Sequence, residues 1–200
     1  MDKVTIVIVD KDGKYLNKVL EGIQVNSNYP YKIIIANAGE PLDIMNVHVI
    51  QSTGGSISRD FKEALMFVDT EFVVGLGSDT VPQKDWLKIA MESYRTNFGQ
   101  GNGVLCLNDT IQDGKVACMV LTTMKTIEEE LNGELYDTRF KHYYNDTLLT
   151  AIARHKGIYA YCPESVVEHK WEMDEGERKR CWNHDRDLYY ATLKEMGINE

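Results

Sequence analysis

Short apolar runs alternate with segments of helical periodicity along the first half of the chain. The runs are rich in β-branched residues and are bounded by Gly, Pro, Asn or Asp, as buried strands are. The expected strands are 4–9, 31–36, 47–50 and 72–77. The expected helices are 15–23, 58–68 and 83–94. This alternation predicts an α/β fold with a mostly parallel central sheet flanked by helices.

Capping residues and turn residues refine these boundaries. Ser58 is a possible N-cap for the second helix, and Pro82 predicts that the third helix opens at Gln83. Beyond Asn97 the pattern becomes less regular. Here we expect strands at 103–107, 116–121 and 158–162, helices at 126–131 and 147–155, a hairpin turn at 113–114, a turn at 163–164, and a charged helical segment over 172–200.

Composition and charge narrow the classes of function. The chain has 200 residues and a net charge of -9, from 22 Lys+Arg against 31 Asp+Glu. This length suits one domain, and the negative charge disfavours nucleic-acid binding, although it equally serves solubility. No apolar run approaches the roughly 20 residues of a membrane span, and no signal peptide opens the sequence. We therefore expect a cytoplasmic protein, which is compatible with one domain of a longer chain.

Cysteine spacing gives no sign of a structural metal site. The four cysteines are Cys106, Cys118, Cys162 and Cys181, and none forms a C-x-x-C pair. Without a secretory signal, they are expected to be reduced, half-buried thiols.

The stretch 72–82 is the centre of the functional hypothesis. An apolar run stops abruptly at Ser78 and Asp79. Ligands of open α/β sheets bind just past the carboxyl ends of strands, which is where Asp79 is expected. Our hypothesis, which the resemblance described below supports, is that Asp79 holds a divalent metal that carries a sugar-nucleotide diphosphate. The alternative is an ordinary helix cap or turn residue.

Two further residues could complete such a site. Asp146 precedes an expected helix and follows an aromatic loop, and His169 follows the last expected strand. Each also has an ordinary structural interpretation. Asp146 could be an N-cap, and His169 a surface or core histidine.

The order of these residues resembles that in the nucleotide-diphospho-sugar glycosyltransferases of the GT-A fold, of the family 2 type. In that family a D-x-D at a strand end is followed by Pro and an aromatic-Leu pair. A later acidic pair precedes a helix that ends in a basic residue and Gly, and a Pro-Glu, a short strand and a His then follow. The corresponding segments here are GSDTVPQKDWL (77–87), YNDTLL (144–149) with RHKG (154–157), and PESVVEH (163–169). The resemblance spans roughly residues 3–171 and implies a GT-A fold.

The resemblance also implies roles for particular residues. Asp79 and His169 would bind Mn²⁺ or Mg²⁺, and Asp146 would be the general base of an inverting transfer. The donor would be a UDP-sugar, with glucose or rhamnose as the expected sugar. The acceptor would be a hydroxyl of a glycan or glycoprotein.

Nucleotide recognition would fall to residues 1–97, and acceptor binding and catalysis to 98–171, with 172–200 as a charged helical extension of the same domain. Val9, Asp10 and Asn37 match positions that grip the base and ribose, and Arg59 matches a basic residue near the base or diphosphate. The alternative for the Gly-rich loop before Arg59 is an ordinary turn between strand and helix. Aromatic side chains could stack on sugar faces or simply pack; these are Tyr136, Tyr143, Trp171 and Trp182.

Two departures from the family pattern bear on the metal. Gly77 replaces the first carboxylate of the D-x-D, so Ser78 could compensate or metal affinity could be lower. The acidic pair before the helix is Asn145–Asp146, and the usual downstream acidic position is Leu148. The chain is also short, which makes it similar to compact viral glycosyltransferases, including those that decorate chlorovirus capsid glycans.

Two other classes of function stay open. One is a non-catalytic sugar-nucleotide or glycan-binding module on the same fold, for which Gly77 is the sign. The other is a nucleotidyltransferase, which would want a basic Gly-rich loop near the first strand. Residues 10–14 (DKDGK) resemble such a loop only faintly.

Overall fold

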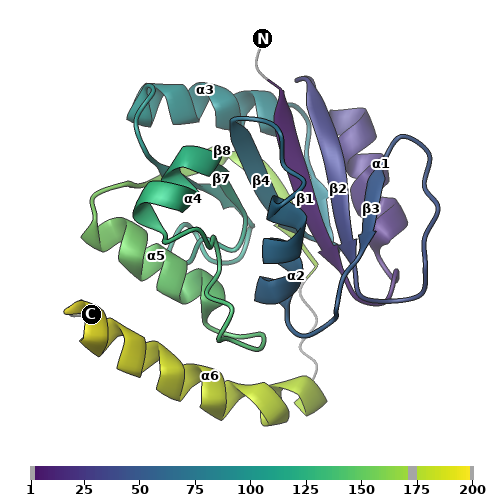
Figure 1. Ribbon diagram of the computed structural model, residues 1–200. Coiled ribbons are helices and arrows are strands. Elements are labelled where there is room, and N and C mark those ends of the chain that lie inside the picture. The colour runs from purple at the N-terminus through teal and green to yellow at the C-terminus, as the bar shows by residue number, and fades with distance from the viewer. Residues whose placement is uncertain (1–2, 171–174, 199–200) are drawn as a thin grey trace.

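The computed structural model describes residues 3–170 and 175–198. Within them the chain forms a single eight-stranded sheet with helices on both faces (Figure 1). The strands are β1 (Val4–Asp10), β2 (Tyr31–Asn37), β3 (His48–Gln51), β4 (Phe72–Gly77), β5 (Thr80–Pro82), β6 (Val104–Asn108), β7 (Val120–Thr123) and β8 (Tyr159–His169). The helices are α1 (Leu16–Asn26), α2 (Ile57–Leu65), α3 (Trp86–Phe98), α4 (Met124–Glu130), α5 (Asn145–His155) and α6 (Glu175–Met196).

The sheet is mixed but mostly parallel, as the alternation predicts. The strand order is β3-β2-β1-β4-β7-β6-β8-β5. Among the described strands, β7 and β5 run opposite to their neighbours, and the other pairs are parallel. Asp10 lies beside Asn37, and Val9 lies beside Gly77. The carboxyl ends of β2, β1 and β4 therefore line up along one edge.

Successive side chains along a strand point to opposite faces of the sheet and are buried in two separate cores. Ile6 and Ile8 of β1 are fully buried against α1 and α3, whereas Val7 is fully buried on the opposite face, toward α2, α4 and α5. Burying such a side chain stabilises the fold by about 1.5–3 kcal/mol. Because both faces are covered, the run 4–9 is continuously apolar.

A third, smaller core attaches α6 to α5 (Figure 1). Tyr189 and Leu193 of α6 pack against Phe140 and Leu148. Asp185 of α6 is fully buried and accepts hydrogen bonds from the backbone amides of residues 141–143, at 3.1, 2.9 and 2.8 Å. The charged segment is therefore a packed helix that holds the loop before α5.

Two of the predicted helix starts are wrong. Residues 80–82 form β5, which pairs with residues 167–169 of β8, so α3 begins at Trp86 instead of Gln83. The N-cap of α2 is Ser56 instead of Ser58, and the Ser56 side chain accepts a hydrogen bond from the Arg59 amide. The start of α3 is thus moved by the pairing with β8, and the start of α2 by a capping hydrogen bond, each by a few residues.

The expected turn at 163–164 is a bulge inside one strand. Cys162 pairs with Leu107, and Val166 pairs with the next residue, Asn108. The extra residues leave the ladder, and the Asn108 side chain donates to the Pro163 carbonyl at 2.8 Å. Because a bulge tolerates proline, β8 continues as far as His169.

The expected hairpin of β6 and β7 is present, with a long connection. The two strands pair antiparallel, and residues 109–119 join them. Asp113 and Gly114 both have positive φ, as the predicted turn requires. The second strand begins at Val120 rather than 116, so Cys118 lies in the connection instead of in a strand.

Candidate active site

A hollow of about 410 Å³ lies at the carboxyl ends of β1 and β2, lined by residues 10–13, 37–40 and 42. Asp10 is buried there, and its Oδ2 accepts a hydrogen bond from the Gly13 amide at 2.9 Å. Its Oδ1 has no hydrogen-bond partner among the described residues. A buried carboxylate oxygen without a partner is costly, so Asp10 has free capacity for a donor group of a ligand.

Asn37 shapes this hollow from the neighbouring strand. Its Oδ1 accepts from the Gly39 amide at 3.0 Å, and its Nδ2 donates to the Glu40 carbonyl at 2.6 Å. A Cβ at Gly39 would lie 2.7 Å from the Lys11 carbonyl oxygen. Only glycine therefore lets the loops after β1 and β2 approach this closely.

Ser78 and Arg59, which are also expected to bind the nucleotide, differ in their contacts with the strand ends that form the hollow. The Ser78 amide donates to the Val9 carbonyl at 3.3 Å, which ties the end of β4 to that of β1. Arg59 lies on α2, and its Nε donates to the Thr138 carbonyl at 3.3 Å. Its observed contact is thus with the segment before α5 and not with the hollow.

Asp79 and His169 are in direct contact although 90 residues separate them. The pairing of β5 with β8 places Thr80 opposite His169, and Asp79 Oδ2 lies 3.2 Å from His169 Nε2. The two side chains are 31% and 19% exposed, so both are accessible to a ligand. Burial alone would raise the pKa of Asp79, but the hydrogen bond and charge of His169 outweigh it and hold that pKa below its usual value.

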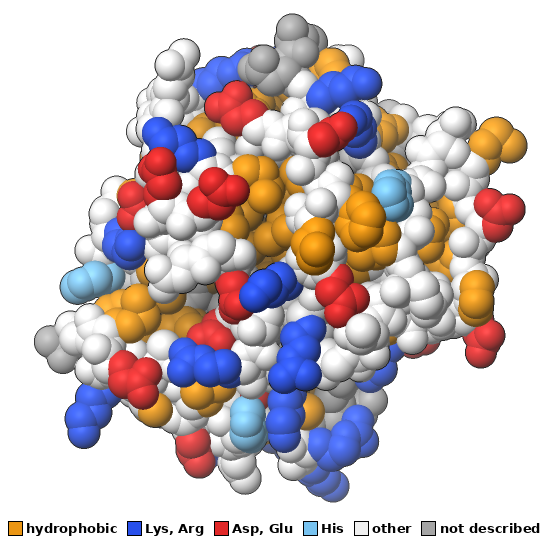
Figure 2. All heavy atoms as spheres, viewed as in Figure 1, with side chains coloured by type: hydrophobic (Ala, Val, Ile, Leu, Met, Phe, Trp, Pro, Cys, Tyr) orange, Lys and Arg blue, Asp and Glu red, His pale blue; other side chains and the backbone are white. Residues whose placement is uncertain are grey.

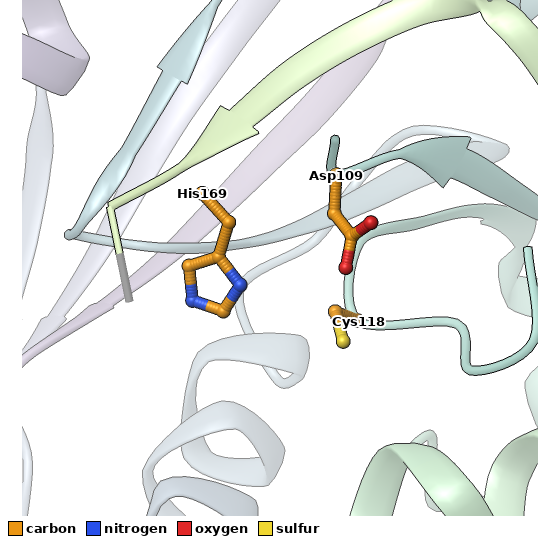
Figure 3. Close-up of side chains that lie close together, drawn as sticks. All are labelled: Asp109, Cys118 and His169. Carbon is orange, nitrogen blue, oxygen red and sulfur yellow. The ribbon is translucent and has the colours of Figure 1, made fainter. Parts of the chain in front are cut away.

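The His169 ring contacts Asp79 on one side and faces Asp109 and Cys118 on the other, where Figure 3 shows these two side chains. Because Nε2 faces Asp79, the nitrogen that points toward Asp109 and Cys118 in Figure 3 is Nδ1. The ligand atoms of Asp109, Cys118 and His169 all lie within 4.8 Å of one another. The His169 amide also donates to the Asp109 carbonyl at 3.2 Å.

Asp109 directly follows β6 and is almost fully buried. Its Oδ1 accepts from the amides of Ile111 and Gln112, at 2.9 and 2.7 Å, which fixes the turn that leaves the strand. Its Oδ2 has no hydrogen-bond partner in the described part of the chain. One carboxylate oxygen is therefore structural, and the other faces Cys118 and His169 (Figure 3).

Cys118 links this cluster to Asp146. Its thiol donates to Asp146 Oδ2 at 3.2 Å, and Asp146 Oδ1 accepts from the Thr147 amide at 2.8 Å. Burial raises the pKa of Cys118, and the charges of Asp146 and Asp109 raise it further. The thiol is therefore a proton donor that orients the Asp146 carboxylate.

Asp146 is not the N-cap of α5. The N-cap is Tyr144, which has a φ of 64°, and Asp146 lies in the first turn of the helix. The helix N-terminus stabilises a negative charge there. The structure thus brings Asp79, His169 and Asp146 into one cluster, through two residues that the sequence did not single out.

Asp109 and Cys118, which were not predicted from the sequence, differ in whether a sequence signal marks them. Asp109 follows a strand directly, as Asp79 does, so the same sequence signal could have found it. Cys118 lies in an irregular connection and has no such signal. Of the aromatic residues suggested as sugar platforms, Tyr136 is buried against Phe61, and Trp171 lies outside the described residues.

The pair Asp79 and His169 fits a divalent cation. Two ligands about 2.1 Å from an octahedral ion and at right angles to each other are about 3 Å apart. The observed 3.2 Å between Asp79 Oδ2 and His169 Nε2 is close to this value. Carboxylate and imidazole together suit Mn²⁺.

No family model and no curated protein sequence matches this chain, whereas solved structures do. The mannosyltransferase PcManGT from Pyrobaculum calidifontis, in complex with GDP-Man and Mn²⁺, matches with a TM-score of 0.68 and 15% identity, over 98% of this chain and 65% of that one. S. aureus TarS 1–349 in complex with UDP-GlcNAc matches with a TM-score of 0.64 and 14% identity, over 86% of this chain and 59% of that one.

This chain thus spans less than two thirds of either structure. The likenesses do not bear on the expected similarity to viral domains, which stays a prediction. No described helix has the length and apolar character to cross a membrane. At such low identity the matches establish the fold, and the chain has the GT-A-like fold of these glycosyltransferase structures.

Proposed function

We propose that this protein is a metal-dependent glycosyltransferase that moves a sugar from a nucleotide-sugar donor, expected to be a UDP-sugar, to an acceptor hydroxyl. The observation that carries this proposal is the gathering of Asp79, His169 and Asp146 from three distant parts of the chain into one cluster. The fold supports it, because two solved structures of the same fold are complexes with UDP-GlcNAc and with GDP-Man and Mn²⁺.

The donor would lie along the edge formed by β2, β1 and β4. Asp10 Oδ1 would accept a hydrogen bond from the nucleoside in the hollow, and Asp79 Oδ2 and His169 Nε2 would hold the cation. The bound cation would neutralise the charge that develops on the leaving diphosphate. Ser78, whose amide donates to the Val9 carbonyl, would make an additional contact with the donor.

Asp146 would act as the general base. Its Oδ2 would take the proton of the acceptor hydroxyl while that oxygen bonds to the anomeric carbon and the bond to the diphosphate breaks. Attack from the side opposite to the leaving group inverts the anomeric centre. The contacts from Thr147 and Cys118 hold the carboxylate in one orientation, which is what a positioned base requires.

The competing function is a binding module that holds a sugar nucleotide without transfer. Gly77 favours it, because the first carboxylate of the D-x-D is missing. The two functions predict the same fold and the same nucleotide affinity, and they differ only in turnover.

The deciding experiment measures donor consumption with and without Mn²⁺. The donor panel would be UDP-glucose, UDP-rhamnose, UDP-GlcNAc and GDP-mannose, with a mixture of simple sugar acceptors. We expect Mn²⁺-dependent transfer or slow hydrolysis of one donor, and a loss of about 10²–10⁴-fold in Asp146→Asn with unchanged UDP affinity. The exposed Asp187→Asn is the matched control.

Binding of UDP without turnover of any donor would favour the binding module. Full transfer by Asp146→Asn would remove the assigned base without touching the metal assignment. Asp79→Asn tests that assignment separately, through the Mn²⁺ dependence of UDP binding.

A further inference from the structure

A second set of metal-ligand atoms lies on the far side of the His169 ring from Asp79. Asp109, Cys118 and His169 offer a carboxylate oxygen, a sulfur and a ring nitrogen within 4.8 Å of one another (Figure 3). The ring nitrogen is Nδ1, so this set and the Asp79 pair use opposite edges of one imidazole.

Asp109 is the observation that points to a ligand. The residue is 2% exposed, and its Oδ2 has no hydrogen-bond partner within the described ranges. An unpaired buried carboxylate oxygen is costly unless a cation or a donor satisfies it. The residues that face it are Cys118 and His169, which are both metal-binding types.

We propose that Asp109, Cys118 and His169 form a binding site for a borderline-soft divalent cation of the zinc class. Sulfur and imidazole donors select Zn²⁺ or Co²⁺ over Mg²⁺ and Mn²⁺, which prefer oxygen. Binding would release the Cys118 thiol proton to solvent and replace it with the metal–sulfur bond. Asp146 Oδ2, 3.2 Å from Cys118 Sγ, or a water would complete a tetrahedral shell.

Occupation of this site has a consequence that rests on the proposed function. The Cys118 thiol now hydrogen-bonds Asp146, and a zinc-class cation bound to the sulfur would draw the same carboxylate toward itself. The assigned base would then be unavailable to the acceptor hydroxyl. A neutral imidazole binds a metal through one nitrogen and carries its proton on the other, so zinc at Nδ1 would also compete with Mn²⁺ at Nε2. Zinc is therefore expected to inhibit transfer, and excess Mn²⁺ is expected to relieve part of that inhibition.

The test uses Co²⁺ as a spectroscopic probe on the full chain. We expect a thiolate-to-cobalt charge-transfer absorption that Zn²⁺ displaces. Cys118→Ser should abolish it, and Asp109→Asn should weaken Co²⁺ affinity at least about tenfold, since even outer-shell changes cost 10–100-fold. Cys181→Ser and Asp79→Asn should retain the absorption, and circular dichroism would verify that each variant is folded.

Absence of the absorption in folded wild type, or its persistence in Cys118→Ser, would overturn the site. The result is independent of the transferase assignment, because no donor is present. Asp79→Asn separates the two sites directly, since it should lose Mn²⁺-dependent UDP binding while it keeps the cobalt signal.

Discussion

At the scale of single residues, Gly77 shows how this chain differs from the D-x-D pattern. A Cβ at this position would lie 2.5 Å from Asp79 Oδ1, which is closer than real contacts allow. The Asp79 side chain therefore folds back over residue 77, into the space that the first carboxylate would enter. The missing carboxylate is thus coupled to the observed orientation of Asp79 toward His169.

Restoring the missing carboxylate is expected to weaken cation binding. In Gly77→Asp, the new Cβ should displace Asp79 from His169, so Mn²⁺-dependent UDP affinity should fall about tenfold or more. Isothermal titration with UDP at several Mn²⁺ concentrations measures this. Gly77→Ala separates sterics from charge and should show the same loss. A gain in affinity in Gly77→Asp would contradict the steric coupling.

Asp10 gives a second prediction at this scale. In Asp10→Asn the free carboxylate oxygen of the hollow loses its charge, or an amide nitrogen replaces it. UDP affinity without metal should fall by about 1.5–3 kcal/mol, the worth of a hydrogen bond to a charged group. Asp43→Asn, at an exposed position outside the hollow, should leave the affinity unchanged. Equal affinities for both variants would remove Asp10 from the nucleotide site.

The order of Asp79, Asp146 and His169 along the chain was enough to predict the centre of the cluster. Asp109 and Cys118, which connect His169 to Asp146, were not predicted from this order. Cys118 comes into position through an irregular connection, and no local pattern encodes such a path. The ligand contact expected of Arg59, from its place after a Gly-rich loop, stays a prediction, and the hydrogen bond of its Nε to the Thr138 carbonyl could not be read from the local sequence.

At the scale of elements, one buried carboxylate adds to the apolar core that attaches α6 to the domain. Asp185 accepts three backbone amides of the loop 141–143, and it also pairs with His184 Nδ1 at 2.8 Å. That loop leads directly into α5, which carries Asp146 in its first turn. We therefore expect α6 to influence the position of the assigned base through this loop.

Removing this carboxylate should both destabilise the fold and reduce turnover. Asp185→Ala leaves three amide donors without their acceptor, which should cost on the order of 3 kcal/mol in the free energy of unfolding. Urea denaturation measures this, with the exposed Asp187→Ala as control. Asp185→Asn, which keeps one acceptor oxygen, should lose less. Unchanged stability of Asp185→Ala would show that α6 is held by its apolar contacts alone.

Asp185 also gives the stability a pH dependence. Burial by itself would raise the pKa of Asp185, but the hydrogen bonds from His184 and from residues 141–143 hold it below its usual value. A lowered folded-state pKa means that the contribution is complete above the unfolded value of about 3.9 and is lost as pH falls through the folded-state pKa. The difference in unfolding free energy between wild type and Asp185→Asn should therefore be smaller at about pH 3 than at pH 6. An equal difference in unfolding free energy at both pH values would contradict this.

The elements of the first half were predictable because their signals are local. A β-branched run such as 4–9 and the periodic segment 15–23 carry their own patterns. By contrast, β5 is three residues long and exists only because β8 pairs with it. Sequence periodicity cannot show such a pairing.

At the scale of the whole molecule, the chain carries a net charge of -9. Acidic and basic side chains are interspersed over the face seen in Figure 2, with basic groups along α6 at its lower edge. Such a mixed surface suits solubility.

Donor and cation together should stabilise the entire fold. A ligand at 100 times its dissociation constant adds about 2.7 kcal/mol, which corresponds to roughly 5–10 °C in the melting temperature at this size. Thermal scans with UDP, with Mn²⁺ and with both would measure this, and the largest shift is expected for both. In Asp79→Asn, Mn²⁺ should add nothing to the shift with UDP. An undiminished Mn²⁺ effect in that variant would refute the cation assignment.

The pairing of β5 with β8 joins two segments that the ribosome synthesises at different times. The strands β1 to β4 and the hollow beside Asp10 are complete within the first 77 residues. His169 follows Asp79 by 90 residues, which is on the order of ten seconds of synthesis. The proposed cation site therefore cannot form until long after the residues of the hollow have been synthesised, and β5 lacks its pairing partner throughout that interval.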